Sequence, residues 1–517
     1  MTSSSTAQSG LSDAASDRSF FGHPRGLSTL FLTEMWERFS YYGMRALLIL
    51  FMTTSLQLGG LGLDIATAGA LYGTYTAMAY LMNVPGGWLA DKVLGQRKAV
   101  LYGGILIACG HFSLAIPVNE LFAFGLVLIV LGTGLLKPNI SVIVGQLYSQ
   151  TDTRRDAAYS IFYMGINLGS FVGQLVTGYL AQDAGFRDMI VGWGMDPNMT
   201  WHWAFGAAGI GMTLGVIQYV LGGHTLGTAG VVPGAATTPE STAQFKRQAI
   251  LYGGIAVGVV ALIALASAVG LLTITPNLIS DTAGSVLLVL TVVFFARLFL
   301  DKSWTPEERS RLWVIFSFFI CAAVFWSVFD QAGSTLSLFA DRNSDNQVLG
   351  YAFPSAWYQS LNPLFIVIFA PVFAALWVKL GDKQPSSPVK FAIGLIGAGV
   401  GFWVMAIAAI EADAGQLVGP LWLTFVYLIH TWAELCLSPV GLSSMTKLAP
   451  TRIVGSMMGV WFLGASVGNF FAGQMATLYE SMPLAQLFGV VSILPVVAGI
   501  VMLLLAKRMT AMMGGVR

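Results

Sequence analysis

Long apolar runs separated by short polar segments dominate the chain. A helix that crosses the hydrocarbon core of a bilayer needs about 20 consecutive, mostly apolar residues. The pattern predicts fourteen such spans, near residues 27–56, 67–90, 98–117, 120–148, 156–181, 201–222, 248–272, 281–300, 311–340, 355–380, 389–410, 416–446, 453–477 and 485–506. A segment rich in Gly, Ala, Thr and Pro, 223–243, follows the sixth span. We therefore expect an all-α membrane protein.

The basic residues between the spans test this count, because Lys and Arg collect on the cytoplasmic side of membrane proteins. With the N-terminus inside, 21 of the 26 Lys and Arg residues fall in inside segments, and only Arg187 and Arg342 fall in outside loops. The other three, Arg38, Arg45 and Lys137, lie within spans. One missed span would move every later loop to the opposite side of the membrane and remove this asymmetry. The pattern therefore predicts a multi-pass protein with both termini in the cytoplasm.

The order of the spans divides the chain into four parts. We predict a flexible cytoplasmic tail at 1–26, an N-terminal six-helix bundle at 27–222, a linker with two extra transmembrane helices at 223–310, and a C-terminal six-helix bundle at 311–517. Two six-helix halves around a central cavity are the plan of the major facilitator superfamily. The expected fold is this plan with two extra helices.

Composition and motifs narrow the function. Hydrophobic residues make up 56% of the chain and charged residues 10%, whereas a soluble domain carries roughly 25% charged residues. The net charge of +1 gives no basic excess for nucleic acid. Cys109, Cys321 and Cys436 lie far apart in apolar segments, as small core residues do. No P-loop, HExxH motif or Cys/His metal spacing is present, so we expect neither an enzyme nor a cofactor.

The first span carries charged residues that a membrane disfavours. A charge inside the bilayer costs several kcal/mol and usually faces a cavity or a partner. Positions at i, i+3, i+4, i+7, i+8 and i+11 share one helix face, and here they hold Glu34, Glu37, Arg38, Tyr41, Tyr42 and Arg45. This stripe indicates a functional face inside the protein. A purely structural stripe of salt bridges is the simpler alternative.

Further charges lie deep in other spans. Lys137 and Glu434 each lie roughly 25 Å from the outer surface at 1.5 Å per residue. Arg45 and Asp330 are each roughly 27 Å from the inner surface by the same rise. The first pair could meet toward the cytoplasmic side of a cavity and the second toward its outer side. One pair at each mouth, with one member from each half, is what an alternating-access gate would need.

Neutral polar and aromatic residues accompany these charges. They are Tyr80, Tyr163, Asn167, Trp326, Ser334, Asn362, Ser438 and Trp461. Any one of them more often serves in helix packing than in ligand contact. A buried amide such as that of Asn167 or Asn362, however, needs a hydrogen-bond partner within a membrane. His430 is isolated and lies one turn before Glu434.

Three motifs carry a family resemblance. They are the run Glu34–Gly43, which fits ExxERFxYYG, the run Gly86-Gly87-Trp88-Leu89-Ala90-Asp91 with Gly95, and the run from Tyr159 through Phe162–Phe171. In order and position they resemble the signatures of the proton-dependent oligopeptide transporter (POT, or PTR) family, and the two extra helices look like its bacterial branch. The resemblance covers the whole chain.

This resemblance implies a proton symporter that imports di- and tripeptides across the inner membrane. Its partners would be short peptides, protons and the lipid bilayer, with no obligate protein partner. The implied proton-coupling residues are Glu34, Glu37 and Arg38. The implied peptide-binding residues are Arg38, Tyr42, Tyr80, Lys137, Tyr163, Asn167, Trp326, Asn362, Glu434, Ser438 and Trp461. The implied gates are Arg45 with Asp330 and Lys137 with Glu434. Mammalian members carry a histidine in the second helix, and span 67–90 has none, so coupling would rest on carboxylates.

Alternatives remain on the same fold. The cargo could be nitrate, a drug or a plant metabolite, although an anion carrier has less need of Glu434. A channel or a non-transporting peptide sensor is a second alternative, which uphill accumulation driven by a pH gradient would exclude. A membrane enzyme is more remote, because no catalytic constellation is present.

Overall fold

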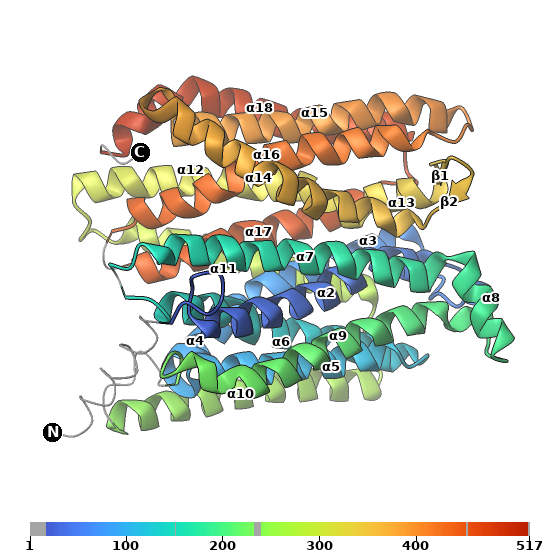
Figure 1. The fold of residues 1–517 in the computed structure, drawn as a ribbon, viewed down its shortest axis with the longest axis horizontal. Helices are drawn as coiled ribbons and strands as arrows, with labels where there is room; N and C mark the ends of the chain where they lie inside the picture. The colour runs from blue at the N-terminus through green and yellow to red at the C-terminus, as the bar shows by residue number, and fades with distance from the viewer. Residues whose placement is uncertain (1–16, 150, 232–238, 451–452, 515–517) are drawn as a thin grey trace. The chain divides into compact units, whose positions relative to one another are not determined.

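The computed structural model describes residues 17–149, 151–231, 239–450 and 453–514, and most of them are helical (Figure 1). The chain divides into two compact units, which are described separately. Unit 1 comprises residues up to Tyr42, then Met82–Gly173 and Phe205–Ile279, and unit 2 comprises the rest. Most of the predicted tail 1–26, and residues 232–238 of the predicted linker, lie outside the described residues. The predicted four-part division stays a prediction.

Unit 1 is built from long helices with short connections. Its elements are α4 (Asn83–Leu89), a π-helical turn (Ala90–Leu94), α5 (Gln96–Leu114), α6 (Asn119–Gln146), a 3-10 turn (Gly223–Leu226) and α10 (Pro239–Ala268). It also includes parts of α2 (Arg25–Thr53), α7 (Arg154–Gln182) and α9 (Thr200–Gly222). Its apolar core joins α2, α5, α6, α7 and α9 through residues that include Leu27, Leu30, Val100, Ile107, Leu136, Ile140, Phe162 and Met212.

Glycines on α7 set how closely that helix approaches α2. A Cβ added at Gly169 would lie 2.0 Å from the carbonyl oxygen of Met35, and one at Gly173 would lie 2.4 Å from that of Phe39. Residues four apart share one helix face, so these glycines form a strip without side chains. Such strips let two membrane helices pack backbone against backbone. The packing positions the charged face of α2.

Unit 2 contains the remaining helices. They are α3 (Ile65–Leu81), α8 (Ala184–Gly192), α11 (Pro276–Leu300), α12 (Pro306–Phe329), α13 (Thr335–Arg342), α14 (Leu361–Leu380), α15 (Ser387–Asp413), α16 (Pro420–Leu448), α17 (Val454–Ala476) and α18 (Leu484–Met512). Shorter 3-10 turns cover Leu56–Leu58, Pro197–Met199, Asp330–Gly333, Ser355–Ser360 and Gly381–Lys383. The strands β1 (Gln347–Val348) and β2 (Tyr351–Ala352) form an antiparallel hairpin, with Gln347 opposite Ala352.

Aromatic and small residues hold the helices of unit 2 together. Phe318 on α12 stacks on Phe391 on α15, with ring centroids 4.3 Å apart. Helices α15 and α18 lie side by side (Figure 1). There, a Cβ at Gly399 would lie 2.5 Å from a methyl group of Val496. Helices α3 and α17 approach similarly, at Gly73 and Gly473.

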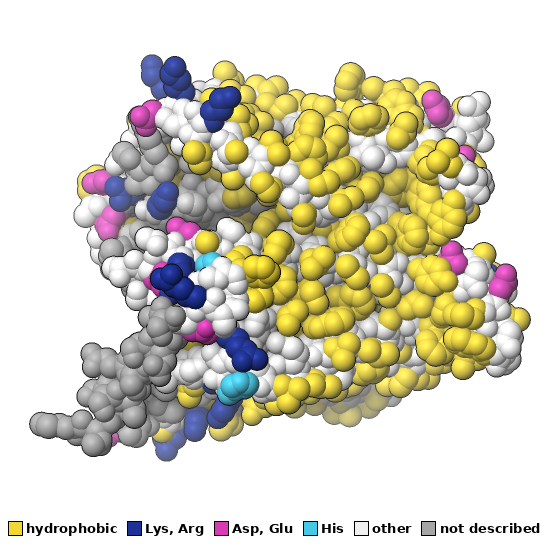
Figure 2. Space-filling model, viewed as in Figure 1, with side chains coloured by type: hydrophobic (Ala, Val, Ile, Leu, Met, Phe, Trp, Pro, Cys, Tyr) yellow, Lys and Arg dark blue, Asp and Glu magenta, His cyan; other side chains and the backbone are white. Residues whose placement is uncertain are grey.

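Each of the fourteen predicted segments contains an α-helix, and the predicted all-α membrane class is confirmed. In the described part of the chain, nine segments have the length and apolar composition to cross a membrane, so the count of fourteen stays a prediction. Side chains along the middles of the helices are mostly hydrophobic on the face in Figure 2, and Lys and Arg lie near helix ends. This surface suits a lipid environment.

Two predicted spans are interrupted rather than continuous. The span 67–90 breaks at Met82, between α3 and α4, because Pro85 has no N–H to donate to the preceding turn. The span 311–340 changes from α12 to a 3-10 turn at Asp330–Gly333 before α13 begins. A Cβ at Gly333 would lie 1.7 Å from the hydroxyl of Tyr72, so this turn packs tightly on α3.

Candidate functional site

A buried cluster of three charges lies on α2 in unit 1. Arg38 Nε lies 3.1 Å from Glu34 Oε1 and also donates to Glu37 Oε2. The side chains are nearly inaccessible, with Glu37 at 0% and Arg38 at 2% exposure. The spacing i, i+3, i+4 brings them together along one helix face. The structure therefore joins the three residues that the sequence singled out.

The cluster has both an unused donor and unused acceptors, since Arg38 Nη2 is buried without a hydrogen-bond partner among the described residues. Glu34 Oε2 and Glu37 Oε1 are buried and have no hydrogen-bond partner among the described residues. The guanidinium carbon of Arg38 also lies 5.3 Å from the ring centre of Tyr41 and 5.7 Å from that of Tyr42. Two carboxylates that share one guanidinium repel each other in a buried site. A proton added to either carboxylate removes that repulsion, so the arrangement can bind and release protons.

Other predicted residues of unit 1 lie on α6 and α7. Lys137, on α6, interacts electrostatically with Glu34. Asn167 is 4% exposed, and its Nδ2 donates to the carbonyl oxygen of Tyr163 one turn earlier at 2.9 Å. The Tyr163 side chain is 39% exposed. The Asn167 amide group thus finds a partner in its own helix, which sequence alone did not predict.

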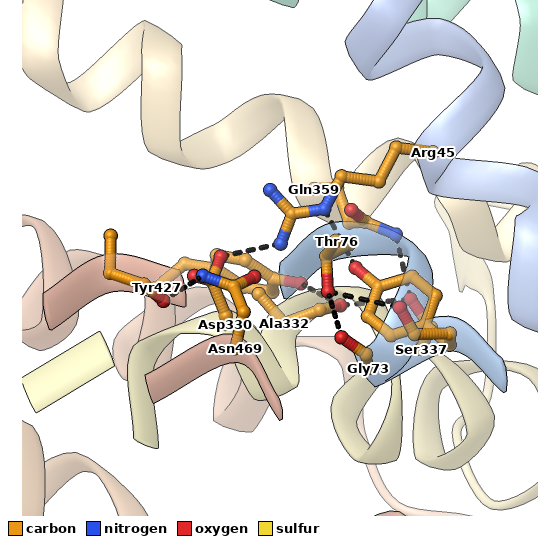
Figure 3. A network of polar contacts seen from close by, with 11 residues as sticks. Arg45, Gly73, Thr76, Asp330, Ala332, Ser337, Gln359, Tyr427 and Asn469 are labelled. Atoms are coloured by element: carbon orange, nitrogen blue, oxygen red, sulfur yellow. Dashed lines mark hydrogen bonds and ion pairs between the residues drawn. The ribbon is translucent and has the colours of Figure 1, made fainter. Parts of the chain in front are cut away.

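A second buried network lies in unit 2 (Figure 3). Arg45 Nη2 lies 2.5 Å from Asp330 Oδ1, and Arg45 Nε donates to the hydroxyl of Tyr72 at 2.7 Å. Asp330 is 2% exposed and Arg45 6%. Nearby, the Tyr427 hydroxyl donates to the carbonyl oxygen of Ala332 at 3.4 Å. The expected meeting of Arg45 and Asp330 is thus present as an ion pair that joins α2 to the end of α12.

Glu434 on α16 is held by a neutral partner. Asn362 Nδ2, on α14, lies 3.1 Å from Glu434 Oε2 and 3.1 Å from the hydroxyl oxygen of Thr431. Thr431 lies three residues before Glu434, on the same helix face. His430 Nε2 lies 3.1 Å from the carbonyl oxygen of Ala398. The Asn362–Glu434 contact leaves the second carboxylate oxygen of Glu434 for another donor.

Several predicted polar residues of unit 2 have unused hydrogen-bonding atoms. Trp326 Nε1, Ser334 Oγ and Ser438 Oγ are buried and have no partner among the described residues. Tyr80 packs against Phe462 with ring centroids 6.4 Å apart. Trp461, 7% exposed, fills the space above Gly441. Buried polar atoms usually have a hydrogen-bond partner, so these three atoms are available to bind one.

The predicted pairing of Lys137 with Glu434 stays a prediction. Lys137 belongs to unit 1 and Glu434 to unit 2. The roles assigned to individual residues from the sequence likewise stay predictions. In the described part of the chain, no group of three or more His, Cys, Asp or Glu side chains is arranged to hold a metal ion.

Sequence reasoning missed Tyr72, Gln359 and Thr431. The Tyr72 hydroxyl accepts from Arg45 Nε, and Gln359 Nε2 donates to the carbonyl oxygen of Ala46 and to the Ser337 hydroxyl. A signal for Tyr72 existed, because Tyr72 and Tyr80 lie eight residues apart and share a helix face. Gln359 had none, since it lies in a 3-10 turn, Ser355–Ser360, at the start of the predicted span 355–380.

Known transporters resemble this chain over most of its length. A model of the POT family matches residues 97–494. The chain is 44% identical over 467 residues to the peptide transporter YePEPT of Yersinia enterocolitica, with 88% of each chain covered. It is 36% identical over 515 residues to the di-/tripeptide transporter of Lactococcus lactis subsp. cremoris, with 97% of this chain and 99% of that one covered. The crystal structure of the peptide transporter POT in complex with sulfate superposes with a TM-score of 0.87 at 42% identity, covering 96% of this chain and 97% of that one.

Proposed function

Because the chain belongs to the POT family, we propose that it is a proton-coupled symporter that imports di- and tripeptides by alternating access. It lies in the inner membrane with both termini in the cytoplasm, as the inside excess of Lys and Arg supports. Two of its relatives are transporters named for peptides or for di- and tripeptides. The proposal extends their activity to this chain.

The buried Glu34–Glu37–Arg38 cluster carries the proposal. A proton-coupled carrier needs a group that gains a proton on one side of the membrane and loses it on the other. Here one guanidinium faces two carboxylates, each with an oxygen that has no described partner. A peptide carboxylate that engages Arg38 would weaken its hold on Glu37, so peptide and proton binding become linked. Glu37 is thus the coupling carboxylate, with Glu34 in support.

Charges of opposite sign serve the two ends of a zwitterionic peptide. Arg38 and Lys137 receive the carboxylate, because cationic donors form charge-assisted hydrogen bonds with it. Glu434 receives the amine, and Asn362 positions Glu434 through the 3.1 Å bond. Asn167 presents its carbonyl oxygen to the amine, since its Nδ2 is already bonded to Tyr163.

Roomy aromatic walls accept variable side chains. A binding site of broad specificity reads the groups that all its ligands share and surrounds the rest with apolar, aromatic surface. The proposed wall residues are Tyr42, Tyr80, Tyr163, Trp326, Ser438 and Trp461. The unsatisfied Trp326 Nε1 and Ser438 Oγ supply donors to peptide carbonyl oxygens.

Two ion pairs act as gates. The Arg45–Asp330 pair closes the outer mouth, since a 2.5 Å contact between nearly inaccessible side chains must break for solvent to pass. Lys137 and Glu434 form the corresponding inner contact in the empty carrier. Both pairs would join the N-terminal and C-terminal bundles.

Uptake into proteoliposomes tests the proposal. Labelled dialanine should accumulate above its outside concentration when the outside is more acidic, and accumulation should stop when the gradient is collapsed. Glu37→Gln should abolish this uphill uptake but keep peptide exchange between the two sides, because a neutral Gln cannot cycle a proton. Glu120→Gln is a matched control at the exposed start of α6.

The rival functions give different results in the same vesicles. Competition by nitrate but not by dipeptides would indicate an anion carrier. Equilibration without accumulation would indicate a channel, and binding without flux a sensor. Wild-type accumulation by Glu37→Gln would refute the coupling role of that residue.

A further inference from the structure

A buried lysine at the start of α15 has no carboxylate partner among the described residues. Lys390 is 8% exposed. Its Nζ donates to Gln384 Oε1 at 2.8 Å and lies 4.3 Å from the ring centre of Trp377. Neither partner carries a negative charge. An ammonium group has three N–H donors, so these contacts leave one for a further acceptor.

The surroundings of Lys390 add further positive potential and do not neutralise the charge of its ammonium group. Lys390 is the fourth residue of α15, and a helix N-terminus carries a partial positive charge that favours anions. The N-cap residue Ser386 makes no side-chain capping bond. Exposed Lys379 and Lys383 flank the turn just before Gln384, and within the described residues neither forms an ion pair. Asp382 is the one acidic side chain of that turn.

The apolar surface beside this corner suits acyl chains. Ile368, Val372 and Leu376 on α14 are 49%, 56% and 42% exposed and share one helix face, and Lys379 follows Leu376 by three residues on that face. Tryptophan favours the boundary between hydrocarbon and headgroups, and Trp377 lies three residues before the end of α14. A hydrocarbon-facing strip therefore leads directly to a cluster of cations.

We propose that the Trp377–Lys390 corner, defined as Trp377, Lys379, Lys383, Gln384 and Lys390, binds an anionic phospholipid. Its phosphate accepts from Lys390 Nζ, with Lys379 and Lys383 as further cationic contacts. The acyl chains lie along Ile368, Val372 and Leu376. Gln384 and the Trp377 ring hold the ammonium in place for the lipid. The site is separate from the cargo and proton residues and does not depend on which solute is carried.

Lipid retention by the purified full-length protein tests the site. The detergent-solubilised chain is mixed with equal amounts of phosphatidylglycerol and phosphatidylcholine, and native mass spectrometry measures which lipid stays bound. The wild type should prefer phosphatidylglycerol. Lys390→Gln should lower this preference about five-fold, because it removes the attraction of one lysine to the anionic headgroup. Lys302→Gln removes an exposed lysine at the α11–α12 connection and should leave the preference unchanged.

A second variant and a second ligand keep the result decisive. Lys379→Gln combined with Lys383→Gln alters only exposed side chains and should also lower the preference. If Lys390→Gln does not fold, by size-exclusion chromatography, this double variant decides alone. An unchanged preference in the folded variants overturns the proposal. Displacement of phosphatidylglycerol by an equal concentration of inorganic phosphate also overturns it, in favour of a site for the free anion.

Discussion

Neutralising Asp330 measures what the buried ion pair with Arg45 contributes. In Asp330→Asn the guanidinium keeps Tyr72 at 2.7 Å but loses the charge 2.5 Å away. Removing one partner of a buried pair typically costs about 3–5 kcal/mol. Glu480→Gln is the matched control, because the Arg342–Glu480 pair has the same chemistry but side chains 39% and 61% exposed. Exposed pairs contribute about 0–1 kcal/mol.

The same free energy shifts a conformational equilibrium if the pair forms only when the outer mouth is closed. A loss of about 3 kcal/mol corresponds to more than about a hundredfold change in that equilibrium. The outward-open state should therefore become the main state of Asp330→Asn. Arg45→Gln should do the same, and the double variant should cost less than the sum of the singles because no charge is left unpaired.

A single accessible thiol reports the shift. Cys109 is exposed and is replaced by Ser, whereas Cys321 and Cys436 are buried and stay. Ala332→Cys then places a thiol beside the pair (Figure 3). Labelling from outside by a membrane-impermeant maleimide should be at least about tenfold faster in Asp330→Asn, and unchanged in Glu480→Gln. Equal labelling rates in folded wild type and Asp330→Asn would refute the gate.

Three further predictions concern other parts of the chain. Glu434→Gln should weaken binding of free dipeptides strongly but of N-acetylated dipeptides little, and Lys137→Gln should show the mirror pattern with C-amidated peptides. Equal losses for all ligands in competition binding would instead mean that the two residues only pair with each other. Burial, assisted by the charge of Arg154, lowers the pKa of His23. Neutral His23 therefore stabilises residues 17–24 above about pH 6.5, and this stabilisation is lost as the pH falls through the pKa of the folded state. Hydrogen exchange in that segment, corrected for intrinsic rates, should therefore rise toward about pH 5 in the wild type but not in His23→Gln; a pH-independent wild type would contradict this. Gly169→Ala should lower the thermal unfolding temperature, because its Cβ would lie 2.0 Å from the carbonyl oxygen of Met35 and overpacking costs about 1–3 kcal/mol. Gly253→Ala, with open space around it, should not lower it. Equal shifts for the two variants would mean that the α2–α7 contact accommodates an added methyl group.

Periodicity and depth predicted the parts of the site that regular helices position. The i, i+3, i+4 spacing brought Glu34, Glu37 and Arg38 to one face of α2, where they are in contact. Counting residues along spans placed Arg45 and Asp330 at matching depth, and they form an ion pair. Both arguments use only the fixed rise and turn of an α-helix, which holds in lipid because the backbone must satisfy its own hydrogen bonds.

Irregular backbone and side-chain choice escaped prediction. The 3-10 turn at Asp330–Gly333 depends on contact with Tyr72, a residue far away in sequence. Asn167 has two possible uses, a ligand or its own helix, and the structure shows the bond to Tyr163. Local propensity is similar for both uses, so only packing decides between them. Hydropathy could not reveal these outcomes, since it averages over a window longer than either feature.

The charge count of the unit 1 cluster has an electrical consequence. Glu34 and Glu37 carry two negative charges when ionised, and Arg38 with Lys137, which interacts with Glu34, carries two positive ones. The sum is zero, so this group feels no net force from the voltage across the membrane. One added proton gives it a net charge of +1, on which each 100 mV acts with about 2.3 kcal/mol if the charge crosses the whole field. Voltage should therefore act on this cluster in its protonated form and spare its unprotonated form.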